Sequence, residues 1–386
     1  MKRFIWLYPA TGLIVGLIAW NYKPAYMPVS LLLLPAWYYA QNRLIAFLTV
    51  FFYFAAASHG LPVGTMTYLQ TNFFNASFTW LTGVFLVSLP FLLFFNNKKL
   101  RIIGLYIALI AVAIPPFGLT CWTHPLASTG MWWPGGGWLA LAAVLLLIPV
   151  FCRWPVLLAV PILLALFLSY KTVAIPSDCS SLNTNFSGLA SQNNSFSSPG
   201  AKDFKNDFVQ QINTISSINN DFQHTQNTIV LLPEGSGGTW LAGNPQLWES
   251  RLTFPGTVLV GATVPSGNYK DSVILAVSRE GSRPIYRQRM PVPLSMWWPG
   301  HRHSYRAHWF DNPVVHLQGH RLAFFVCYEQ FLLWPVLQSL WHKPDLLCAT
   351  SNVWWAAGTY IPDIQHNIMA AWSQLFAVPL LTATNF

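Results

Sequence analysis

The chain has 386 residues, of which 53% are hydrophobic and only 9% are charged, whereas soluble proteins usually carry about a quarter charged residues. Its formal charge of +9 is unevenly spread. Residues 1–170 contain eight Lys and Arg and no Asp or Glu, and residues 171–386 contain thirteen bases against twelve acids. The basic excess therefore belongs to the loops of an apolar region, which argues against a nucleic-acid partner and indicates a membrane protein.

Roughly seven apolar runs in residues 1–170 are long enough, or nearly so, to cross a bilayer. Lys and Arg gather before the first run and after the second, fourth and sixth, with Lys23 as an exception. Because positive loops stay in the cytoplasm, the amino terminus is expected inside. Seven crossings of the bacterial inner membrane would then place the chain after residue 170 in the periplasm. No small-residue cleavage site follows the first run, so it is predicted to be retained. The runs lie at about 4–20, 25–40, 44–58, 77–96, 102–118, 136–152 and 154–170.

Residues 171–227 are expected to form a linker that leads into a second domain. The stretch Pro176–Gly200 is rich in Ser and Asn, which is typical of a loop. An amphipathic helix is predicted after it, because apolar residues recur there at helical spacing. These residues are Phe204, Phe208, Ile212, Ile215 and Ile218.

Residues 228–386 change to short β-type runs, with helical segments between the later ones. This alternation predicts a layered α/β domain with a buried sheet. The third run is expected to fold as a hairpin that turns at Arg279–Ser282. The β-type runs are 227–235, 256–265, 272–290, 321–329, 345–352 and 377–385, and the helical segments are 329–342 and 363–376.

Two of these runs end in residues that could carry chemistry. Glu234 ends "IVLLPE", where partial burial would raise its pKa and make it a better base. Cys327 follows "LAFFV" and could be a nucleophile. The alternatives are an exposed turn carboxylate and a buried thiol that packs like a small hydrophobe. The catalytic interpretation gains weight because both residues occur in this order with an arginine-bearing hairpin between them.

The order of motifs resembles the nitrilase, or carbon–nitrogen hydrolase, superfamily. A membrane domain before such a module is similar to apolipoprotein N-acyltransferases and, still more, to the smaller TraB-type proteins of plasmid conjugal transfer. The resemblance implies a polytopic α-helical membrane domain in residues 1–170 and a nitrilase-like αββα sandwich in residues 228–386, acting without a cofactor or a metal. The motifs are "LLPEG", "SVILAVSREGSRPIYRQRMPVP", "FFVCYEQ" and "SNVWWAAGTYIPDIQH".

The resemblance also implies a role for each matching residue. Glu234 would take the thiol proton, Cys327 would form an acyl-thioester, and the N–H of Tyr328 would stabilise the oxyanion. Three further residues would support the site or line its pocket, namely Glu329, Asn352 and Trp354.

The family's catalytic Lys is missing. The segment "YRQRMPVPLSM" has Gln288 at the Lys position and Met296 at the position of a further Glu of the acyltransferases. Arg287 and Arg289 are possible substitutes, but strand neighbours point to opposite faces, so one of them could reach the site only with a bulge or a slipped register. Loss of one oxyanion donor typically costs about 10²–10³ in rate.

Three weaker signals remain. The loop "SMWWPG", with Met296, Trp297 and Trp298, fits a lipid-facing lid or simple packing on the membrane domain. Cys179 and Cys348 would both face an oxidising compartment and could pair. A histidine-rich stretch with Asp311 could bind a metal, but a polar loop is favoured because no ligand triplet has a known spacing. The histidines are His301, His303, His308, His316 and His320.

The sequence thus predicts a membrane-embedded thiol acyltransferase that takes an acyl group from a phospholipid and passes it to an amine or water. A lipoprotein or the conjugation machinery is the expected partner. One alternative is a catalytically degenerate envelope protein that binds lipid or a conjugation partner without turnover. Gln288 and Met296 favour that alternative, whereas Glu234, Cys327 and Glu329 favour the enzyme. An amidase for a small periplasmic amide is a third possibility.

Overall fold

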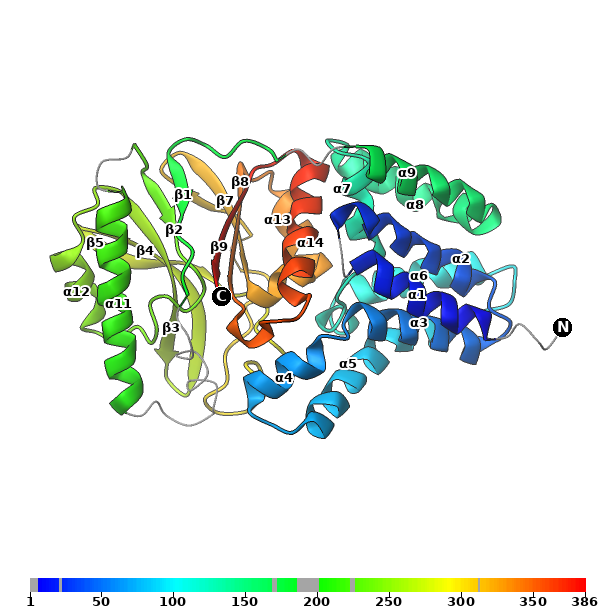
Figure 1. Cartoon of the computed structure of the whole chain (residues 1–386), viewed down its shortest axis with the longest axis horizontal. Helices are drawn as coiled ribbons and strands as arrows, with labels where there is room; N and C mark the ends of the chain where they lie inside the picture. Colours follow the sequence, from blue (N-terminus) through cyan, green and yellow to red (C-terminus); the bar gives the residue numbers. More distant parts are fainter. Residues whose placement is uncertain (1–5, 21–22, 169–171, 186–200, 223–225, 312) are drawn as a thin grey trace. The chain divides into compact units, whose positions relative to one another are not determined.

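The structure is a computed structural model, and it describes residues 6–20, 23–168, 172–185, 201–222, 226–311 and 313–386 (Figure 1). The chain forms two compact units. The first comprises Met1–Val173, Gln330–Val336 and Gly358–Ala377, and the second comprises Ala174–Glu329, Leu337–Ala357 and Val378–Phe386. The acid-free part of the sequence therefore falls in the first unit.

The first unit is helical. Only α5 (Phe73–Leu93) among the described helices is by itself long and apolar enough to cross a membrane, and α3 with α4 forms a pair bent by 59° that passes the same test. The other helices are shorter. They are α1 (Leu7–Trp20), η2 (Pro24–Leu32), α2 (Leu33–Tyr38), α3 (Arg43–Ala57), α4 (Leu61–Leu69), α6 (Arg101–Ala113), η3 (Phe117–Leu119), η4 (Pro125–Ser128), α7 (Thr129–Trp132), α8 (Gly137–Arg153), η5 (Pro155–Leu158), α9 (Ala159–Phe167) and α14 (Ile361–Phe376).

The expected seven spans therefore overcount the long helices in the described part of the chain. Prolines explain much of the difference, because a proline interrupts the helical hydrogen bonds or ends the helix. The run at 25–40 contains Pro28 and divides into a 3₁₀ segment and a six-residue helix. The run at 102–118 stops at Ala113, shortly before Pro115. The length of an apolar run therefore does not show where a helix breaks.

Helices α1 and α3 pack with very little space between them. A Cβ atom added at Gly12 would lie 2.0 Å from the carbonyl oxygen of Thr49, and one at Gly16 would lie 2.3 Å from that of Tyr53. Two glycines four residues apart thus let the backbones meet, as small residues do between membrane helices. A hydrogen bond of 2.8 Å from Trp20 Nε1 to the Tyr53 hydroxyl also joins the two helices.

The second unit contains two β-sheets. The first sheet has the order β1-β2-β3-β4-β5, in which β1, β2 and β3 are parallel and β3, β4 and β5 are antiparallel neighbours. The second has the order β6-β7-β8-β9, in which β7, β8 and β9 are parallel. The strands are β1 (Cys179–Ser181), β2 (Ile229–Leu231), β3 (Thr257–Ser266), β4 (Tyr269–Ser278), β5 (Gly281–Arg287), β6 (Val315–Leu317), β7 (His320–Val326), β8 (Leu346–Asn352) and β9 (Leu380–Asn385).

The two sheets pack face to face around an apolar core. Leu231 and Ile274 of the first sheet and Phe324 and Cys348 of the second are fully buried in it. The other face of the first sheet is covered by α11 (Ala201–Phe222) and α12 (Asn244–Arg251), as Figure 1 shows. Helices α13 (Leu333–Trp341) and α14 follow β7 and β8 in the chain. This sandwich confirms the α/β architecture that the alternating runs predict.

Most expected strands and helices are present, and the hairpin turns between Ser278 and Gly281 as predicted. Three elements were not expected: β1 in the segment predicted as a loop, α12 and β6. Residues 186–200 of that segment lie outside the described residues.

The buried face of α11 also differs from the apolar stripe. Ile215 and Ile218 are buried as predicted, whereas Phe208 is exposed. The side chain of Phe204 lies outside the described part. Before Ile215, the buried face of the helix is lined by polar residues instead, namely Asp207, Gln210, Gln211 and Thr214. Asp207 accepts the backbone N–H of Thr239 at 2.9 Å, so local hydrogen bonding outweighs apolar spacing there.

Candidate active site at the carboxyl ends of the strands

The residues singled out in the sequence come together where strands of both sheets end. Glu234 lies just after β2, Cys327 directly follows β7, and Asn352 ends β8. Gln288 directly follows β5. Strands β2 and β5 run in the same direction, as do β7 and β8, so in each sheet the carboxyl ends share one edge. In α/β folds this edge is the usual place for a ligand.

The Glu234 turn is held tightly against the neighbouring strands. The Thr350 hydroxyl donates to the carbonyl of Leu232 at 2.9 Å and so ties β8 to the segment before Glu234. On the other side, a Cβ atom added at Gly261 of β3 would lie 2.8 Å from the Cα of Glu234. Gly261 is therefore required for the close approach, and the sequence alone did not indicate it.

Cys327 has an unusual backbone. Its φ angle is +44°, in the left-handed region that non-glycine residues rarely adopt. It is the first residue of a short 3₁₀ turn, η6 (Cys327–Phe331), and the residue is only 7% exposed. Strain of this kind persists only where the surrounding structure enforces it, and it often marks a functional residue.

Glu234 accepts a hydrogen bond from the Cys327 thiol and another from the backbone N–H of Asn352. Burial raises the pKa of Glu234 to about 7, the charge of Glu329 adds to the increase, and the two hydrogen bonds oppose it. A carboxylate with a pKa near neutrality can both take a proton from the thiol and return it. Glu234 is thus a hydrogen-bonded proton acceptor beside the Cys327 thiol.

Glu329 has a different environment. Its carboxylate is fully buried and accepts from the Tyr286 hydroxyl at 2.8 Å and from the backbone N–H groups of Arg289, Met290 and Val326 at 2.6, 3.2 and 2.8 Å. The Arg289 guanidinium lies 3.8 Å away. Burial raises the pKa of Glu329, and Arg289 opposes that effect. These bonds fasten the end of β5 to the turn that carries Cys327, so Glu329 positions the site.

The two arginines beside Gln288 have separate positions. Arg287 is partly exposed and lies 3.9 Å from Asp271, which agrees with the alternation expected of a strand. Arg289 is fully buried, as is Gln288, because β5 ends at Arg287 and the alternation ends with it. A bulge does occur in β5, but it lies before Tyr286. Arg289 thus turns inward just beyond the strand, and the expectation that an Arg reaches the catalytic site only with a bulge or a slipped register stays a prediction.

Neither Gln288 nor its neighbour Arg289 simply takes the place of the missing Lys, because both side chains donate hydrogen bonds to other groups. Arg289 donates to the Tyr286 hydroxyl at 3.1 Å, to the Phe324 carbonyl at 3.2 Å and to the Gln338 side chain at 3.1 Å. The Gln288 amide nitrogen donates to the carbonyl of Val326 at 3.1 Å, one residue before Cys327. Its amide oxygen is buried, and no partner for it is found among the described residues. Gln288 thus supports the end of β7.

The remaining expected pocket residues differ in burial. Tyr328 is buried directly after Cys327, and Trp354 is half-buried at the start of η7 (Trp354–Ala356). In the expected lid, Met296 and Trp297 are half-buried and Trp298 is 45% exposed. The loop that contains these residues is held by hydrogen bonds that the sequence did not predict.

Tyr305 forms one of these unpredicted hydrogen bonds. Its backbone N–H donates to the carbonyl of Met296 at 2.8 Å, and its hydroxyl lies 3.0 Å from that of Thr263. Burial raises the pKa of Tyr305 to about 12, the hydrogen bond with Thr263 opposes this effect, and the charge of Glu234 adds to it. No sequence motif marked Tyr305.

The histidine-rich stretch does not form one cluster. His308 lies between Asp271, at 2.9 Å, and Asp311, at 3.1 Å. Arg306 also pairs with Asp271, so the loop after the lid is tied to β4. His320 begins β7 and pairs instead with Asp178. Cys179 and Cys348 are both free thiols in the core between the sheets.

The fold and this site define the class of protein. The family model described as "Carbon-nitrogen hydrolase" matches residues 182–374, which include the Glu234, Cys327 and Glu329 positions. The chain therefore belongs to the carbon–nitrogen hydrolase, or nitrilase, superfamily.

Two relatives match over nearly the whole chain. The "Probable conjugal transfer protein TraB" of Sinorhizobium fredii is 34% identical over 98% of this chain and 97% of its own length. The "Conjugal transfer protein TraB" of Agrobacterium fabrum is 31% identical over 96% of this chain and 90% of its own. Among solved structures, a Nesterenkonia amidase of the nitrilase superfamily matches 55% of this chain and 78% of its own, with 13% identity and a TM-score of 0.35.

Proposed function

We propose that the protein is a membrane-bound, thiol-dependent acyltransferase with amidase-like chemistry, in which Cys327 takes an acyl group from a phospholipid ester. One observation carries the proposal: the Cys327 thiol, on a left-handed backbone, donates a hydrogen bond to a carboxylate whose pKa burial raises to about 7. A buried thiol that served only for packing would need neither the strained backbone nor a basic partner.

The reaction follows from these two groups. Glu234 takes the thiol proton, and the sulfur attacks the ester carbonyl carbon. The tetrahedral oxyanion then collapses, the carbon–oxygen bond to the lysophospholipid breaks, and the proton on Glu234 goes to the leaving oxygen. An amine or water next attacks the thioester, gives a proton to Glu234 and releases the thiol. The backbone N–H of Tyr328 is the proposed oxyanion donor.

Membrane insertion of the first unit is part of the proposal. Phe74, Phe78, Leu81 and Phe85 lie on one face of α5, and each is at least 40% exposed. Exposed apolar side chains at this spacing form a continuous stripe that water would disfavour and lipid would cover. The acid-free sequence of residues 1–170 supports the same conclusion. Positive residues favour a cytoplasmic amino terminus and a periplasmic second unit.

The conjugal-transfer relatives suggest the cellular setting. We propose that the acceptor is a lipoprotein or a component of the conjugation machinery in the bacterial inner membrane. The second candidate function is binding of lipid or of such a partner without turnover. Gln288 favours it, because the amide has no positive charge and its nitrogen is committed to the carbonyl of Val326.

The test is the intact mass of detergent-purified protein after incubation with phosphatidylethanolamine vesicles. We expect an added acyl mass that neutral hydroxylamine removes, since hydroxylamine cleaves thioesters. Cys327→Ala should lack the adduct, and Cys348→Ser, which changes another buried thiol of the same unit, should retain it. If neither the wild type nor Gln288→Lys acquires an adduct, the binding role replaces the acyltransferase.

A fusion of alkaline phosphatase to Phe386 tests the topology separately. The reporter folds only outside the cytoplasm, so a periplasmic second unit predicts an active fusion in membranes that resist alkaline carbonate. An inactive fusion, or release of the protein by carbonate, would contradict the proposed insertion.

A further inference from the structure

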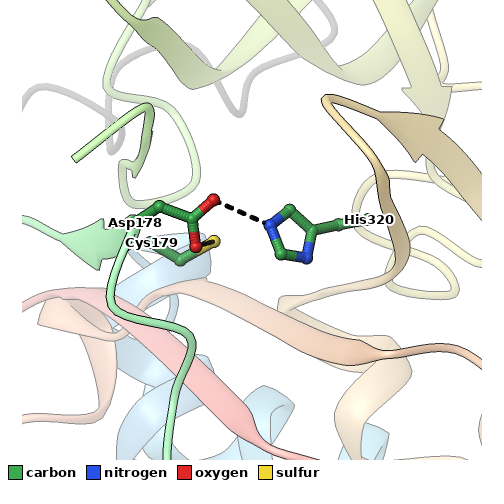
Figure 2. A group of neighbouring side chains, drawn as sticks. All are labelled: Asp178, Cys179 and His320. Carbon is green, nitrogen blue, oxygen red and sulfur yellow. Dashed lines mark hydrogen bonds and ion pairs between the residues drawn. The ribbon is translucent and has the colours of Figure 1, made fainter. Parts of the chain in front are cut away.

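A second group of reactive side chains lies at the opposite edge of the sandwich. Asp178 precedes β1, Cys179 begins β1, and His320 begins β7, so these residues sit at the amino ends of strands (Figure 2). The acyl-transfer chemistry uses none of them. In Figure 2 one carboxylate oxygen of Asp178 points toward the imidazole, and the other lies beside the thiol.

The distances among the three side chains are short. His320 Nε2 lies 2.9 Å from Asp178 Oδ2, and Cys179 Sγ lies 3.8 Å from Asp178 Oδ1. One ligand atom from each residue lies within 4.8 Å of the other two. In a tetrahedral zinc site, with bonds of about 2.0–2.3 Å, ligand atoms lie roughly 3.3–3.7 Å apart. Side-chain adjustments of up to roughly 1 Å would therefore bring the three atoms to the spacing that one ion requires.

The backbone holds the group in place. The carbonyl of Asp178 accepts the N–H groups of Thr228 and Ile229 at 2.8 and 3.1 Å. The Thr228 hydroxyl also lies 3.4 Å from Asp178 Oδ2. His320 is fixed from the other sheet, because it pairs with Leu317 in the β6–β7 hairpin. Hydrogen bonds to the ligands and their backbone are what keep metal ligands oriented.

The side chains of Cys179, His320 and Asp178 differ in their exposure to solvent. The thiol is buried, whereas the side chains of His320 and Asp178 are 19% and 36% exposed. An ion could therefore enter from the solvent side, and water could complete its coordination. Thiolate, imidazole and carboxylate together are the ligand set that zinc accepts and that hard ions such as Mg²⁺ do not select.

We propose that Asp178, Cys179 and His320 form a zinc site that joins the first sheet to the second. Binding replaces the thiol proton by the metal, so one proton is released to solvent and the sulfur becomes a thiolate. No electron is transferred. The ion would cross-link β1 to β7, which are about 140 residues apart in the chain. A cross-link that closes so long a loop restricts the unfolded chain strongly.

Co²⁺ provides the decisive probe, because a thiolate bound to Co²⁺ gives a near-ultraviolet charge-transfer band and tetrahedral Co²⁺ gives strong visible bands. The titration uses full-length protein in detergent with the Cys327→Ala change, which removes the other thiol–carboxylate pair. We expect one Co²⁺ per chain, displacement by Zn²⁺, and loss of the charge-transfer band in Cys179→Ser. Cys348→Ser, a matched buried thiol, should keep the band.

The imidazole and the carboxylate are tested through affinity. His320→Ala and Asp178→Asn should each weaken Zn²⁺ binding by more than the roughly 10–100-fold that loss of a supporting partner costs. The zinc-dependent rise in melting temperature should shrink accordingly. Asp178→Asn preserves volume, so it remains informative if His320→Ala fails to fold.

Three results would overturn the proposal: no bound Co²⁺ or Zn²⁺, a band that survives Cys179→Ser, or equal Zn²⁺ affinity in the ligand variants. The last would locate binding elsewhere, for example near His308. Because the site lies apart from Cys327, hydroxylamine-labile acylation of the otherwise unchanged protein succeeds or fails independently of it.

Discussion

The two edges of the sandwich combine a carboxylate with a thiol in different ways. At the carboxyl ends of the strands, Cys327 has a left-handed backbone, and its thiol donates to a basic Glu234. At the amino ends, Cys179 is the first residue of the regular strand β1, and burial with the nearby Asp178 charge raises its thiol pKa to about 12. Residue types alone do not distinguish the two clusters. Strand direction and backbone conformation do, because they decide which partner each thiol meets.

The difference between the two edges predicts that the thiols of Cys327 and Cys179 are alkylated at different rates. We expect iodoacetamide at pH 7.5, without added metal, to modify Cys327 at least about 10³-fold faster than Cys179. A thiol with a pKa near 12 is almost entirely protonated at that pH, and only the thiolate is nucleophilic. Peptide mass spectrometry over a time course gives both rates, and denatured protein, in which the two should converge, is the control.

Replacing the base tests the Cys327 edge directly. Glu234→Gln should lower the rate of acyl-thioester formation by about 10²–10⁴-fold, since an amide cannot accept the thiol proton. The wild-type rate should rise with pH through about 7, where Glu234 ionises, and the variant should lack this step. An unchanged pH profile in the variant would remove Glu234 from the mechanism.

The same substitution should affect stability with a defined sign. The pKa of Glu234 is higher in the folded than in the unfolded chain, so the folded state holds the proton more tightly and loses stability as pH rises from about 4.5 to 7. Glu234→Gln should therefore melt higher than wild type at pH 8 and similarly at pH 4. Lower stability at pH 8 would contradict the assigned burial effect.

The positioning carboxylate should respond differently from the base. Glu329→Gln is expected to destabilise the second unit by about 3–5 kcal/mol, because it leaves the buried Arg289 without its counter-charge. Urea unfolding measures the loss. The matched control is Asp345→Asn, which breaks the exposed pair with Arg321 at 3.0 Å and should change little. Equal effects in the two variants would show that Glu329 has no special structural role.

The smallest expected effect concerns the contact beneath Glu234. Gly261→Ala places a Cβ atom within about 3 Å of backbone atoms of Pro233, Glu234 and Gly235, so we expect a loss of about 1–3 kcal/mol and slower acylation. Gly243→Ala adds a Cβ atom in open space and is the control. Full activity and stability in Gly261→Ala would mean that the turn tolerates displacement.

Local sequence patterns were sufficient for much of the second unit. Alternating apolar runs predicted β3, β7 and β8, and the polar turn predicted the β4–β5 hairpin, because side-chain period and turn chemistry are local properties. The motif order predicted which residues meet. The helical region was harder, since prolines shortened the runs at 25–40 and 102–118, and a hydropathy window does not register a break in hydrogen bonding.

By itself, the sequence determined the superfamily, the alternation of strands and helices, and the candidates Glu234 and Cys327, because these depend on residue order and short-range pattern. Only the tertiary structure decided that Arg289 turns inward to Glu329, that Gly261 must lack a side chain, and that Asp178 meets His320. Each of these depends on atoms from distant segments. Burial and the neighbouring charge, which set the pKa of Glu234, likewise arise only when the two sheets close around it.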